Sequence, residues 1–535
     1  MKRFLLSSFL FTGSLFFAQT ELVFVFFKDK PNKAEFYSNP ISELSQKSLD
    51  RRTNLGIALN DQDAPIEQSY IDAIEDLIFE VKDQSKWLNG VAVNATSEQI
   101  AQLEALSFVD HVESFVKNPS GGKLKPSERK NKFENIDAKT DFDYGAGNAQ
   151  IEQINLKPLH EQGFTGAGIT IAVFDTGFPT VNTGSGYARL RNNGQIKGGY
   201  NFIDKDTNLY DLGFNSHGSY CLGVIGGYLT GEYVGSAPDA DFYLYVTESG
   251  PQEIPEEELY WIQAAEEADR VGVDIISASL GYGDFFDDTR YNYTYEDMTG
   301  SRSFVARGAQ IAAEKGILVH AANGNEAYSA WHYLVTPADN EKVFSIGAVD
   351  SSGNSSYFSS FGPNYLGVVK PDVSARGSST AMVYNNSQTN SSGTSFSTPL
   401  AAGGTASFLS AIPKTISREE VKEKLRNTAS LAPEYDDQMG YGILNFGAAF
   451  NQFLDAKNQS IKQKFTVYPN PNNGTFSVNA DADSGIKIFD MSGKQVFSGK
   501  LTKGKNELQL KVASGTYLLT SELNGTSISE KISVK

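Results

Sequence analysis

Cysteine is nearly absent from this chain, which has a single one, Cys221, among 535 residues. No intrachain disulfide can form, so stability must come from packing, with bound ions as an optional addition. Histidine is also scarce, with five residues, and few positions can therefore supply an imidazole as a base or metal ligand. No segment beyond the N-terminus is long and apolar enough to cross a bilayer.

Positive charge is in deficit as well. The chain has 46 Lys and Arg residues against 64 Asp and Glu residues, a formal net charge of -18. Nucleic acids and anionic lipid surfaces require a basic face, so neither is expected as the main partner. Hydrophobic residues at 40% and aromatic residues at 12% are ample for buried cores, and the length predicts two to four domains.

The first 18 residues have the pattern of a secretory signal peptide. Lys2 and Arg3 precede an apolar run, and Ala18 is a small residue at its end. The apolar run is too short for a comfortable membrane span. We therefore expect export, with residues 1–18 removed.

Residues 19–118 alternate strand-like and helix-like patterns and predict a small α+β domain. Strands are expected over 22–27, 87–93 and 109–115, with helices near 70–81 and 96–106. Residues 119–148 are rich in Pro, Gly, Lys and Arg, which predicts a linker exposed to proteolysis.

Residues 149–453 predict an α/β domain with a mostly parallel sheet and helices on both faces. Short β-branched runs over 169–174, 242–246, 275–279, 317–321 and 343–348 alternate with helical stretches. Functional residues are expected at the carboxyl ends of such strands.

A short linker over 454–461 is expected to lead into a different kind of domain. Residues 462–535 show short alternating strands separated by turns, at 475–478, 486–489, 507–510, 516–519 and 527–534. The pattern predicts a small all-β sandwich. It contains no His and no Cys, so binding or sorting is its expected role.

The segment 390–404 places Ser395 between a Gly-Thr turn and a helix of small residues. A helix N-terminus offers free N–H groups and a positive dipole end that favour developing negative charge. Gly-Thr-Ser is also ordinary turn composition. A nucleophile is indicated only if a base and an orienting carboxylate occur in similarly special settings.

Two upstream residues meet this condition. Asp175 ends a buried strand, and His217 begins a helix of small residues. Either alone has a structural explanation, as a turn cap or as a buried imidazole. Together they supply what a serine hydroxyl needs, a base and a carboxylate that orients the base. Asn323 follows the strand ending near 321 and is expected to donate to an oxyanion, although Asn-Gly also forms tight turns.

These motifs resemble those of the subtilisin-like serine proteases, the subtilases. Asp175, His217, Asn323 and Ser395 occur in the family's order, and Ser277-Ala278-Ser279-Leu280-Gly281 looks like its substrate-binding strand. The resemblance implies a subtilisin-like fold and a serine endopeptidase acting through an acyl-enzyme on protein or peptide substrates. It also implies no required cofactor, substrate binding by Ser279, Leu280 and Gly281, and a propeptide over 19–118 that inhibits until cleavage.

The chain departs from the family at two positions next to the base. His217-Gly218-Ser219-Tyr220 stands where His-Gly-Thr-His is usual, and Ser219 keeps a hydroxyl. Cys221 occupies the position of the cysteine in the family's thiol-containing branch. We expect it to pack beneath the site rather than act as a nucleophile, and we expect sensitivity to mercurials.

An acidic, tyrosine-rich insertion over 284–297 follows the substrate strand and contains Asp284, Asp287, Asp288, Glu296 and Asp297. Calcium prefers such oxygen ligands, and many subtilases bind it. No EF-hand spacing is present, so a solvated acidic loop is the favoured explanation of the composition. Structural calcium is thus an open alternative and no metal ligand is assigned. The insertion is also positioned to narrow the cleft.

The C-terminal part resembles the sorting domain of the type IX secretion system of Bacteroidetes. The motif residues are Phe465–Gly474, Ile488–Gly493, Ser514–Tyr517 and the basic end Lys531–Lys535. This implies secretion or cell-surface localisation, with the secretion machinery as a partner; a generic carbohydrate- or protein-binding sandwich is the alternative. For the whole chain, the alternative to a protease is a binding or adhesion protein on a catalytically silent subtilase scaffold. A sedolisin-type acid protease would need Glu in place of His217.

Overall fold

The computed structural model describes residues 19–77, 80–122, 144–212, 216–462, 465–480, 483–491, 493–523 and 526–535. The signal peptide expected over 1–18 and the part of the expected linker over 123–143 lie outside these ranges. The chain divides into two compact units, Met1–Ala449 and Phe450–Lys535. Across the described helices, none has both the length and the apolar character needed to traverse a membrane.

The N-terminal domain (residues 19–122) contains an antiparallel sheet in the order β2-β3-β1-β4. Its main elements are β1 Glu21–Phe27, α3 Gln68–Glu75, β2 Val81–Ser85, β3 Gly90–Ala95, α4 Ser97–Glu104 and β4 Val109–Ser114. Successive side chains of a strand face opposite sides. Val23 and Val25 accordingly pack with Ile71, Ile74 and Leu103 of the covering helices, while Leu22 and Phe24 join the core of the next domain.

Two expectations for this domain are corrected by the structure. The helix expected over 70–81 is α3, which ends at Glu75, and Val81 begins β2. The segment between β1 and α3, in which no helix is expected, carries α1 Lys33–Ser38 and α2 Gln46–Leu55. The buried residues of α2 are Ser48, Arg51 and Arg52. A search for apolar periodicity misses a helix whose buried side is charged.

The central domain (residues 144–449) contains a seven-stranded sheet in the order β13-β12-β11-β10-β5-β9-β6. The strands are β5 Thr170–Asp175, β6 Ile196–Asn201, β9 Asp241–Val246, β10 Ile275–Ala278, β11 Leu318–Ala322, β12 Phe344–Val349 and β13 Val373–Arg376. Every neighbouring pair is parallel. The predicted parallel sheet is confirmed, and the edge strands β6 and β13 are additional to it.

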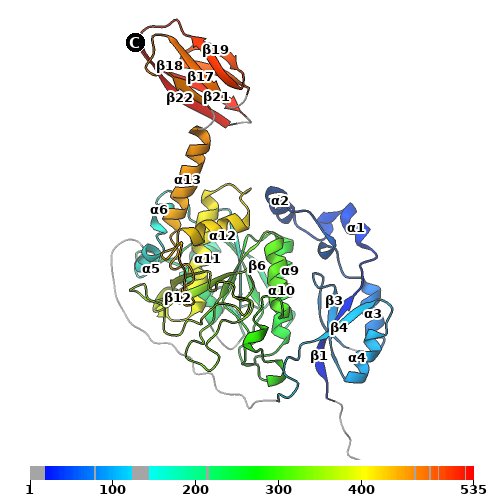
Figure 1. The fold of residues 1–535 in the computed structure, drawn as a ribbon. Helices are drawn as coiled ribbons and strands as arrows, with labels where there is room; N and C mark the ends of the chain where they lie inside the picture. Colours follow the sequence, from blue (N-terminus) through cyan, green and yellow to red (C-terminus); the bar gives the residue numbers. More distant parts are fainter. Residues whose placement is uncertain are drawn as a thin grey trace, which may run out of the picture. The chain divides into compact units, whose positions relative to one another are not determined.

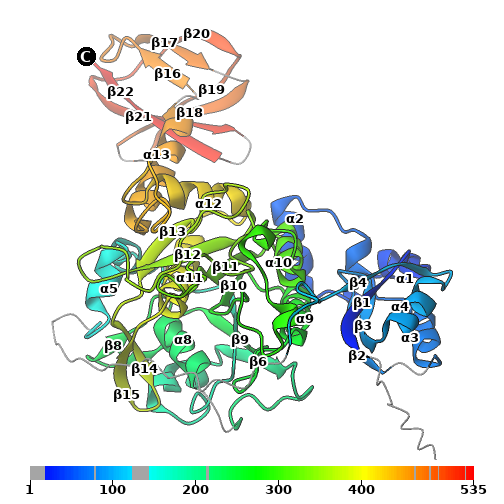
Figure 2. The same cartoon turned by 60° about the horizontal axis from the view of Figure 1, so that its bottom comes forward.

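Helices cover both faces of this sheet. Helices α9 (Glu256–Val271) and α10 (Phe304–Glu314) lie between the sheet and the N-terminal domain, as both views show (Figures 1 and 2). Helices α8 (His217–Gly226) and α11 (Thr394–Ala411) contact the sheet and each other. The remaining elements are α5 Asn148–Gln153, α6 Lys157–His160, α7 Ala188–Asn192, β7 Tyr228–Leu229, β8 Tyr233–Val234, β14 Thr380–Tyr384, β15 Ser387–Ser391 and α12 Arg418–Asn427.

Helix α13 (Phe446–Lys462) runs through residues 454–461, so the linker expected there is helical. The C-terminal unit contains two antiparallel sheets, ordered β16-β17-β20 and β19-β18-β21-β22. Their strands are β16 Phe465–Tyr468, β17 Thr475–Ala480, β18 Ser484–Asp490, β19 Gln495–Leu501, β20 Gly504–Gln509, β21 Gly515–Leu523 and β22 Thr526–Val534. Side chains from both sheets, including Val478 and Ile488, share one core, as the predicted sandwich requires.

Candidate active site

Asp175 and His217 meet at the carboxyl end of β5. Asp175 is the last residue of the strand and is fully buried. His217 is the first residue of α8, and its Nδ1 lies 2.8 Å from Oδ1 and 3.0 Å from Oδ2 of Asp175. The backbone N–H of Thr176 donates to the same carboxylate at 2.8 Å. The carboxylate is thus held in place and fixes the orientation of the imidazole.

This contact depends on the glycine that follows His217. A Cβ at Gly218 would lie 2.4 Å from the carbonyl oxygen of Gly177 and 2.8 Å from Cβ of Asp175. Distances this short are not tolerated between non-bonded atoms. Only glycine therefore lets the first turn of α8 approach the end of β5 closely enough for the hydrogen bond.

The environment of His217 favours its protonated form. Burial alone would lower the pKa of His217, but the negative charge of Asp175 outweighs this and raises the pKa well above its usual value. A carboxylate that stabilises an imidazolium is what a general base needs when it takes a proton from a nucleophile.

Ser395 lies in the first turn of α11, where backbone N–H groups have no partner within the helix. Four residues later, Pro399 lacks the N–H that would normally bond to the carbonyl of Ser395. That carbonyl instead accepts from Ser279 Oγ at 2.8 Å and from the thiol of Cys221 at 3.4 Å. The two hydrogen bonds that replace the missing helical bond thus connect Ser395 to the segment after β10 and to α8.

Cys221 contacts both His217 and Ser395. Its Sγ lies 3.8 Å from His217 Nδ1 as well as 3.4 Å from the Ser395 carbonyl oxygen, and it is fully buried. The ring of Phe396, the residue after Ser395, lies 5.6 Å from the ring of His217. The structure therefore brings Asp175, His217 and Ser395 together. Burial raises the pKa of Cys221, so the thiol stays protonated, consistent with its expected packing role.

The two asparagines after β11 lie in different settings. Asn323 is fully buried, and its Nδ2 donates to the Ser360 carbonyl at 2.7 Å. Asn325 is exposed, and its Oδ1 accepts from N and Oγ1 of Thr394, at 2.8 and 3.0 Å. A backbone N–H only donates, so the atom facing it must be the amide oxygen. The contact with Thr394 does not use the NH₂ group of Asn325, and it places this exposed side chain beside the residue that precedes Ser395.

The expectation for Asn323 therefore does not fit the geometry, because a fully buried amide cannot meet a substrate oxygen in an open cleft. The amide that the prediction needed is that of Asn325. Gly324 separates the two with φ +110°, which breaks the alternation of the strand. Both candidate asparagines occur in the Asn-Gly-Asn sequence, and only the turn between them decides which side chain is buried and which is exposed.

Comparisons with known proteins agree with this geometry. The profile described as "Subtilase family" matches residues 166–442, more than half of the chain. The chain belongs to the subtilase family. Residues 22–133 match "Peptidase S8 propeptide domain, Bacteroidota", and residues 466–535 match "Secretion system C-terminal sorting domain". This subtilase is a serine endopeptidase with a propeptide domain and a domain that marks it for secretion.

Three curated relatives illustrate the similarity. Serine protease AprX of Bacillus subtilis (strain 168) is 31% identical over 315 residues, 53% of this chain and 66% of that protein. Subtilisin NAT of Bacillus subtilis subsp. natto is 32% identical over 306 residues, 56% of this chain and 70% of that protein. Subtilisin of Bacillus pumilus is 32% identical over 307 residues, 56% of this chain and 97% of that protein.

The expected substrate strand of the subtilase continues β10 beyond its last residue, Ala278. The hydroxyl of Ser395 donates to the carbonyl of Ser279 at 3.5 Å. Ser279 and Leu280 are buried, and Gly281 is half-buried. A Cβ at Gly281 would lie 2.3 Å from Val335 Cγ2, so the chain must be glycine here to pass that side chain.

Within the described ranges, two groups bring three metal-ligating side chains within 4.8 Å, and neither includes the acidic insertion. One is Asp175, His217 and Cys221. The other is Glu248, Glu253 and Glu257, where burial, followed by the neighbouring carboxylates, raises the pKa of Glu257 well above its usual value.

Two carboxylates of the acidic insertion have partners inside it. Asp288 pairs with Arg290 at 2.7 Å, and Asp297 accepts from N of Thr294 at 2.8 Å. The insertion also contacts the N-terminal domain, because the carbonyl of Arg290 accepts from N of Lys117 and of Asn118, both at 2.7 Å. It therefore lies where the chain leaves the propeptide sheet.

Proposed function

We propose that this secreted subtilase hydrolyses peptide bonds by a Ser-His-Asp triad and is made as a propeptide-inhibited zymogen. The observation that carries the proposal is the Asp175–His217 hydrogen bond next to the start of α11. A buried carboxylate, an imidazole and a serine at a helix N-terminus together supply a base, its orienter and a nucleophile.

In the proposed reaction, Ser395 Oγ attacks the scissile carbonyl while His217 Nε2 accepts its proton. Asp175 holds Nδ1–H and stabilises the imidazolium that forms. His217 then gives the proton to the leaving amine, and the acyl group remains on Ser395. A water molecule, deprotonated by His217, releases the acid and restores the serine.

The oxyanion of each tetrahedral intermediate is proposed to accept hydrogen bonds from Ser395 N–H and from the Asn325 amide. The first is a free donor of the α11 first turn. The second is oriented by Thr394, which fixes the oxygen of the Asn325 side chain. Donors positioned before the reaction lower the barrier because they need no reorganisation.

Substrate is proposed to bind as an extended chain beside Ser279, Leu280 and Gly281. An added strand gains main-chain hydrogen bonds that do not depend on side-chain identity, which suits a broad range of protein or peptide substrates. The proposed inhibitor is the N-terminal domain, whose β4 leads to Lys117 and Asn118 at the insertion. Cleavage within 119–148 would separate it from the central domain.

The test uses purified full-length wild type and Ser395→Ala. Mass spectrometry of the new N-terminus reports cleavage within 119–148, and a fluorophosphonate probe reports an activated serine. Wild type is expected to be cleaved and labelled, and the variant to be neither. Equal processing of both proteins without labelling of either would refute the triad mechanism and favour a binding protein on a silent scaffold.

A further inference from the structure

Two charged contacts between the N-terminal and central domains differ in how completely their charges are paired. One lies at the amino edge of the parallel sheet, before the first residue of β10. There Asp269, in the last turn of α9, is fully buried, and its two carboxylate oxygens pair with Arg51 and Arg52 of α2. The other lies at the opposite end of α9, where a single lysine of the N-terminal domain enters the central domain.

This lysine, Lys117, follows β4 and places its ammonium between two rings of the central domain. Nζ lies 5.7 Å from the ring centre of Tyr293, in the acidic insertion, and 5.5 Å from that of Phe304, the first residue of α10. Nζ is buried and has no hydrogen-bond partner among the residues that the structure describes. A buried ammonium without an acceptor is unfavourable, so the attraction of the rings and of a nearby carboxylate must offset that cost.

The carboxylate is that of Glu258, in the first turn of α9. It is buried, and it accepts from the hydroxyl of Tyr293 at 2.6 Å and from the backbone N–H of Val305 at 2.9 Å. Burial lowers the pKa of Lys117, and the charge of Glu258 is the largest influence that raises it. Burial raises the pKa of Glu258, and the charge of Lys117 is the largest influence that lowers it. Each group is thus the main counter-charge of the other.

The three central-domain residues, Glu258, Tyr293 and Phe304, are called the cation cage below. One side of the cage is covered by the N-terminal domain, because the ring centres of Phe115 and Phe24 lie 3.9 and 5.8 Å from that of Phe304. The bonds that hold the Glu258 carboxylate come from the central domain itself. When the N-terminal domain leaves, the cage therefore keeps its shape, becomes uncovered and loses its main positive charge.

The cage adjoins the strand beside which substrate is proposed to bind. The backbone N–H of Tyr293 donates to the carbonyl of Gly283 at 3.0 Å, and Gly283 follows Gly281 of that strand by two positions. Ser279, at the start of the strand, contacts the hydroxyl of Ser395. From Ser279 to Gly283 the chain spans at most about four extended residues. A substrate strand that reaches Ser395 can therefore also reach the cage.

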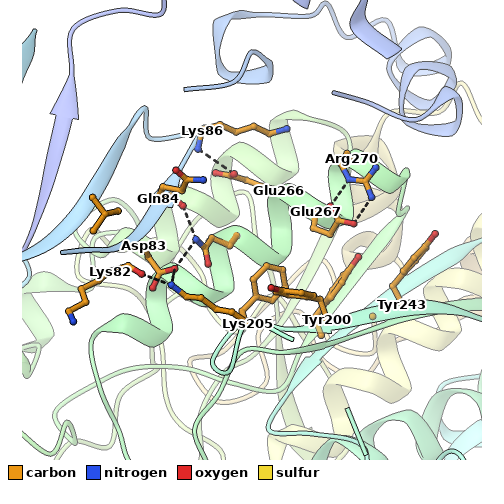
Figure 3. A pocket seen from close by; sticks show the side chains of 15 residues that line it. Lys82, Asp83, Gln84, Lys86, Tyr200, Lys205, Tyr243, Glu266, Glu267 and Arg270 are labelled. Carbon is orange, nitrogen blue, oxygen red and sulfur yellow. Dashed lines mark hydrogen bonds and ion pairs between the residues drawn. The ribbon is translucent and has the colours of Figure 1, made fainter. Parts of the chain in front are cut away.

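A cavity elsewhere between the two domains lacks an unpaired charge of this kind. It has a volume of about 630 Å³ and lies between β2 and the surface formed by α9, β9 and β6. Figure 3 shows charged side chains of its wall paired with one another, Glu267 with Arg270 at 2.5 Å and Asp83 with Lys205 at 3.5 Å. In the cage, by contrast, the counter-charge of Glu258 belongs to the domain that departs.

We propose that the cation cage selects substrates that carry a lysine or arginine side chain before the scissile bond. Lys117 occupies the cage in the zymogen, and a basic side chain of the substrate takes its place in the mature enzyme. The position is before the scissile bond because Lys117 itself precedes the proposed cut within 119–148. The inference rests on the proposed function, since it requires a mature endopeptidase that binds substrate beside Ser279, Leu280 and Gly281.

A basic side chain suits the cage for two physical reasons. The faces of the two rings attract an ammonium or guanidinium group. A neutral side chain would cover the buried Glu258 carboxylate without supplying a counter-charge, which is unfavourable. The strand itself cannot make this distinction, because its main-chain hydrogen bonds do not depend on side-chain identity.

Arg307 is the other cation close to Phe304, and it provides the alternative outcome. Its guanidinium lies 4.3 Å from the ring centre of Phe304 and pairs with Glu113 of the N-terminal domain at 2.9 Å. Arg307 also lowers the pKa of Glu258, but less than Lys117 does. If Arg307 turned to Glu258 after the N-terminal domain leaves, the cage would be filled from within and would not select basic substrates.

The experiment measures selectivity in the mature, self-processed enzyme. Quenched fluorescent peptides of one sequence carry lysine or acetyl-lysine at each position in turn before the scissile bond, because acetylation keeps the length of the side chain and removes its charge. The ratio of kcat/KM for the two peptides is compared in wild type, Glu258→Gln and Glu256→Gln. Glu256 is the matched control, since it lies in the same turn of α9 and residues two apart on a helix do not face each other.

Wild type is expected to favour lysine by about tenfold or more at one position. Glu258→Gln should bring that ratio to within about twofold of unity, and Glu256→Gln should keep the wild-type ratio. A wild-type ratio near unity at every position would overturn the proposal, as filling by Arg307 predicts. A tenfold preference that persists in Glu258→Gln would overturn it as well.

Failure of the cage is distinguishable from failure of the proposed function. If the cage fails, peptides are still cleaved and the fluorophosphonate probe still labels the enzyme, and only the ratio is lost. If wild type neither cleaves nor is labelled, both proposals fall. Should Glu258→Gln not fold, Phe304→Leu is the second variant, because it keeps an apolar side chain without a ring face. It should lower the ratio by about threefold, and an unchanged ratio would contradict the role of the ring.

Discussion

Asp175, the last residue of β5, and Asp269, in the last turn of the covering helix α9, are both fully buried carboxylates, and they differ in their partners. Asp175 faces an imidazole, a group that can gain and lose a proton near neutral pH. Asp269 faces two guanidinium groups, which keep their charge at any ordinary pH. The Asp175–His217 pair can therefore transfer a proton, whereas the ion pairs of Asp269 with the two arginines can only hold their segments together.

The carboxyl and amino edges of the parallel sheet differ in the same way as these two aspartates. At the carboxyl edge, His217, Ser395 and the Asn325 amide each act on the substrate in the proposed mechanism. At the amino edge, Asp269 and Asp63 use both carboxylate oxygens in contacts with charged or backbone groups. Burial and ion pairing therefore do not mark a catalytic residue by themselves; the chemistry of the partner group does.

The largest expected effect breaks this comparison at the carboxyl edge. Ser395→Ala should lower kcat by about 10⁶-fold, the size of loss known for removal of the nucleophile in subtilisin. Asp269→Asn in the mature, propeptide-free enzyme should leave kcat/KM within about twofold, because no group at the amino edge meets substrate. Initial rates on a peptide substrate test both. A large loss of kcat in mature Asp269→Asn would remove the distinction between the edges.

Asp175→Asn should lower kcat by about 10⁴-fold, because the amide no longer stabilises the imidazolium or its tautomer. The negative charge of Asp175 raises the pKa of His217, so its removal should lower that pKa. Ser395 attacks only when His217 is neutral and can accept its proton, and the acid limb of the reaction should therefore move to lower pH. The pH profile of fluorophosphonate labelling measures it. If the acid limb lay at the same pH in Asp175→Asn and in wild type, the assignment of His217 as the base would be contradicted.

The two asparagines give an internal control of intermediate size. Asn325→Ala should lower kcat by about 10²- to 10³-fold with little change in KM, the range known for the oxyanion asparagine of subtilisin. Asn323→Ala should keep kcat within a few-fold and lower the thermal midpoint, since it removes a buried hydrogen bond to Ser360. Reversal of these two outcomes would restore Asn323 as the oxyanion donor.

The smallest expected effect concerns Cys221. Cys221→Ala removes one donor to the Ser395 carbonyl but leaves the stronger contact from Ser279, so kcat should fall by no more than about tenfold. A mercurial should inhibit wild type, because mercury on Sγ would lie beside His217, and should not inhibit the variant. Equal inhibition of both proteins would place the reactive group elsewhere.

The parallel sheet was predictable, and the three residues of the proposed triad could be picked out, because their signals are local. Asp175 ends an apolar run, and His217 and Ser395 each begin a helix of small residues. Such patterns follow directly from strand ends and helix starts. The structure brings all three together, with the sheet in the predicted parallel arrangement.

Features that depend on distant partners were not predictable. Helix α2 buries Arg51 and Arg52, so its sequence has no apolar stripe; its burial is created by Asp269, more than 200 residues away. The choice between Asn323 and Asn325 depends on the turn at Gly324 and on Thr394. No single-sequence pattern records such contacts.

The missing N–H at Pro399 has a mechanical consequence. Because the Ser395 carbonyl is anchored by Ser279 and Cys221, residues 116 and 174 positions away, the nucleophile cannot shift without moving the substrate strand and the helix of the base. A residue with a backbone N–H at position 399 would form the ordinary helical hydrogen bond to the Ser395 carbonyl. That bond would compete with the contacts from Ser279 and Cys221 and weaken them. Pro399 thus couples the start of α11, the segment after β10 and helix α8, so that these three segments move together.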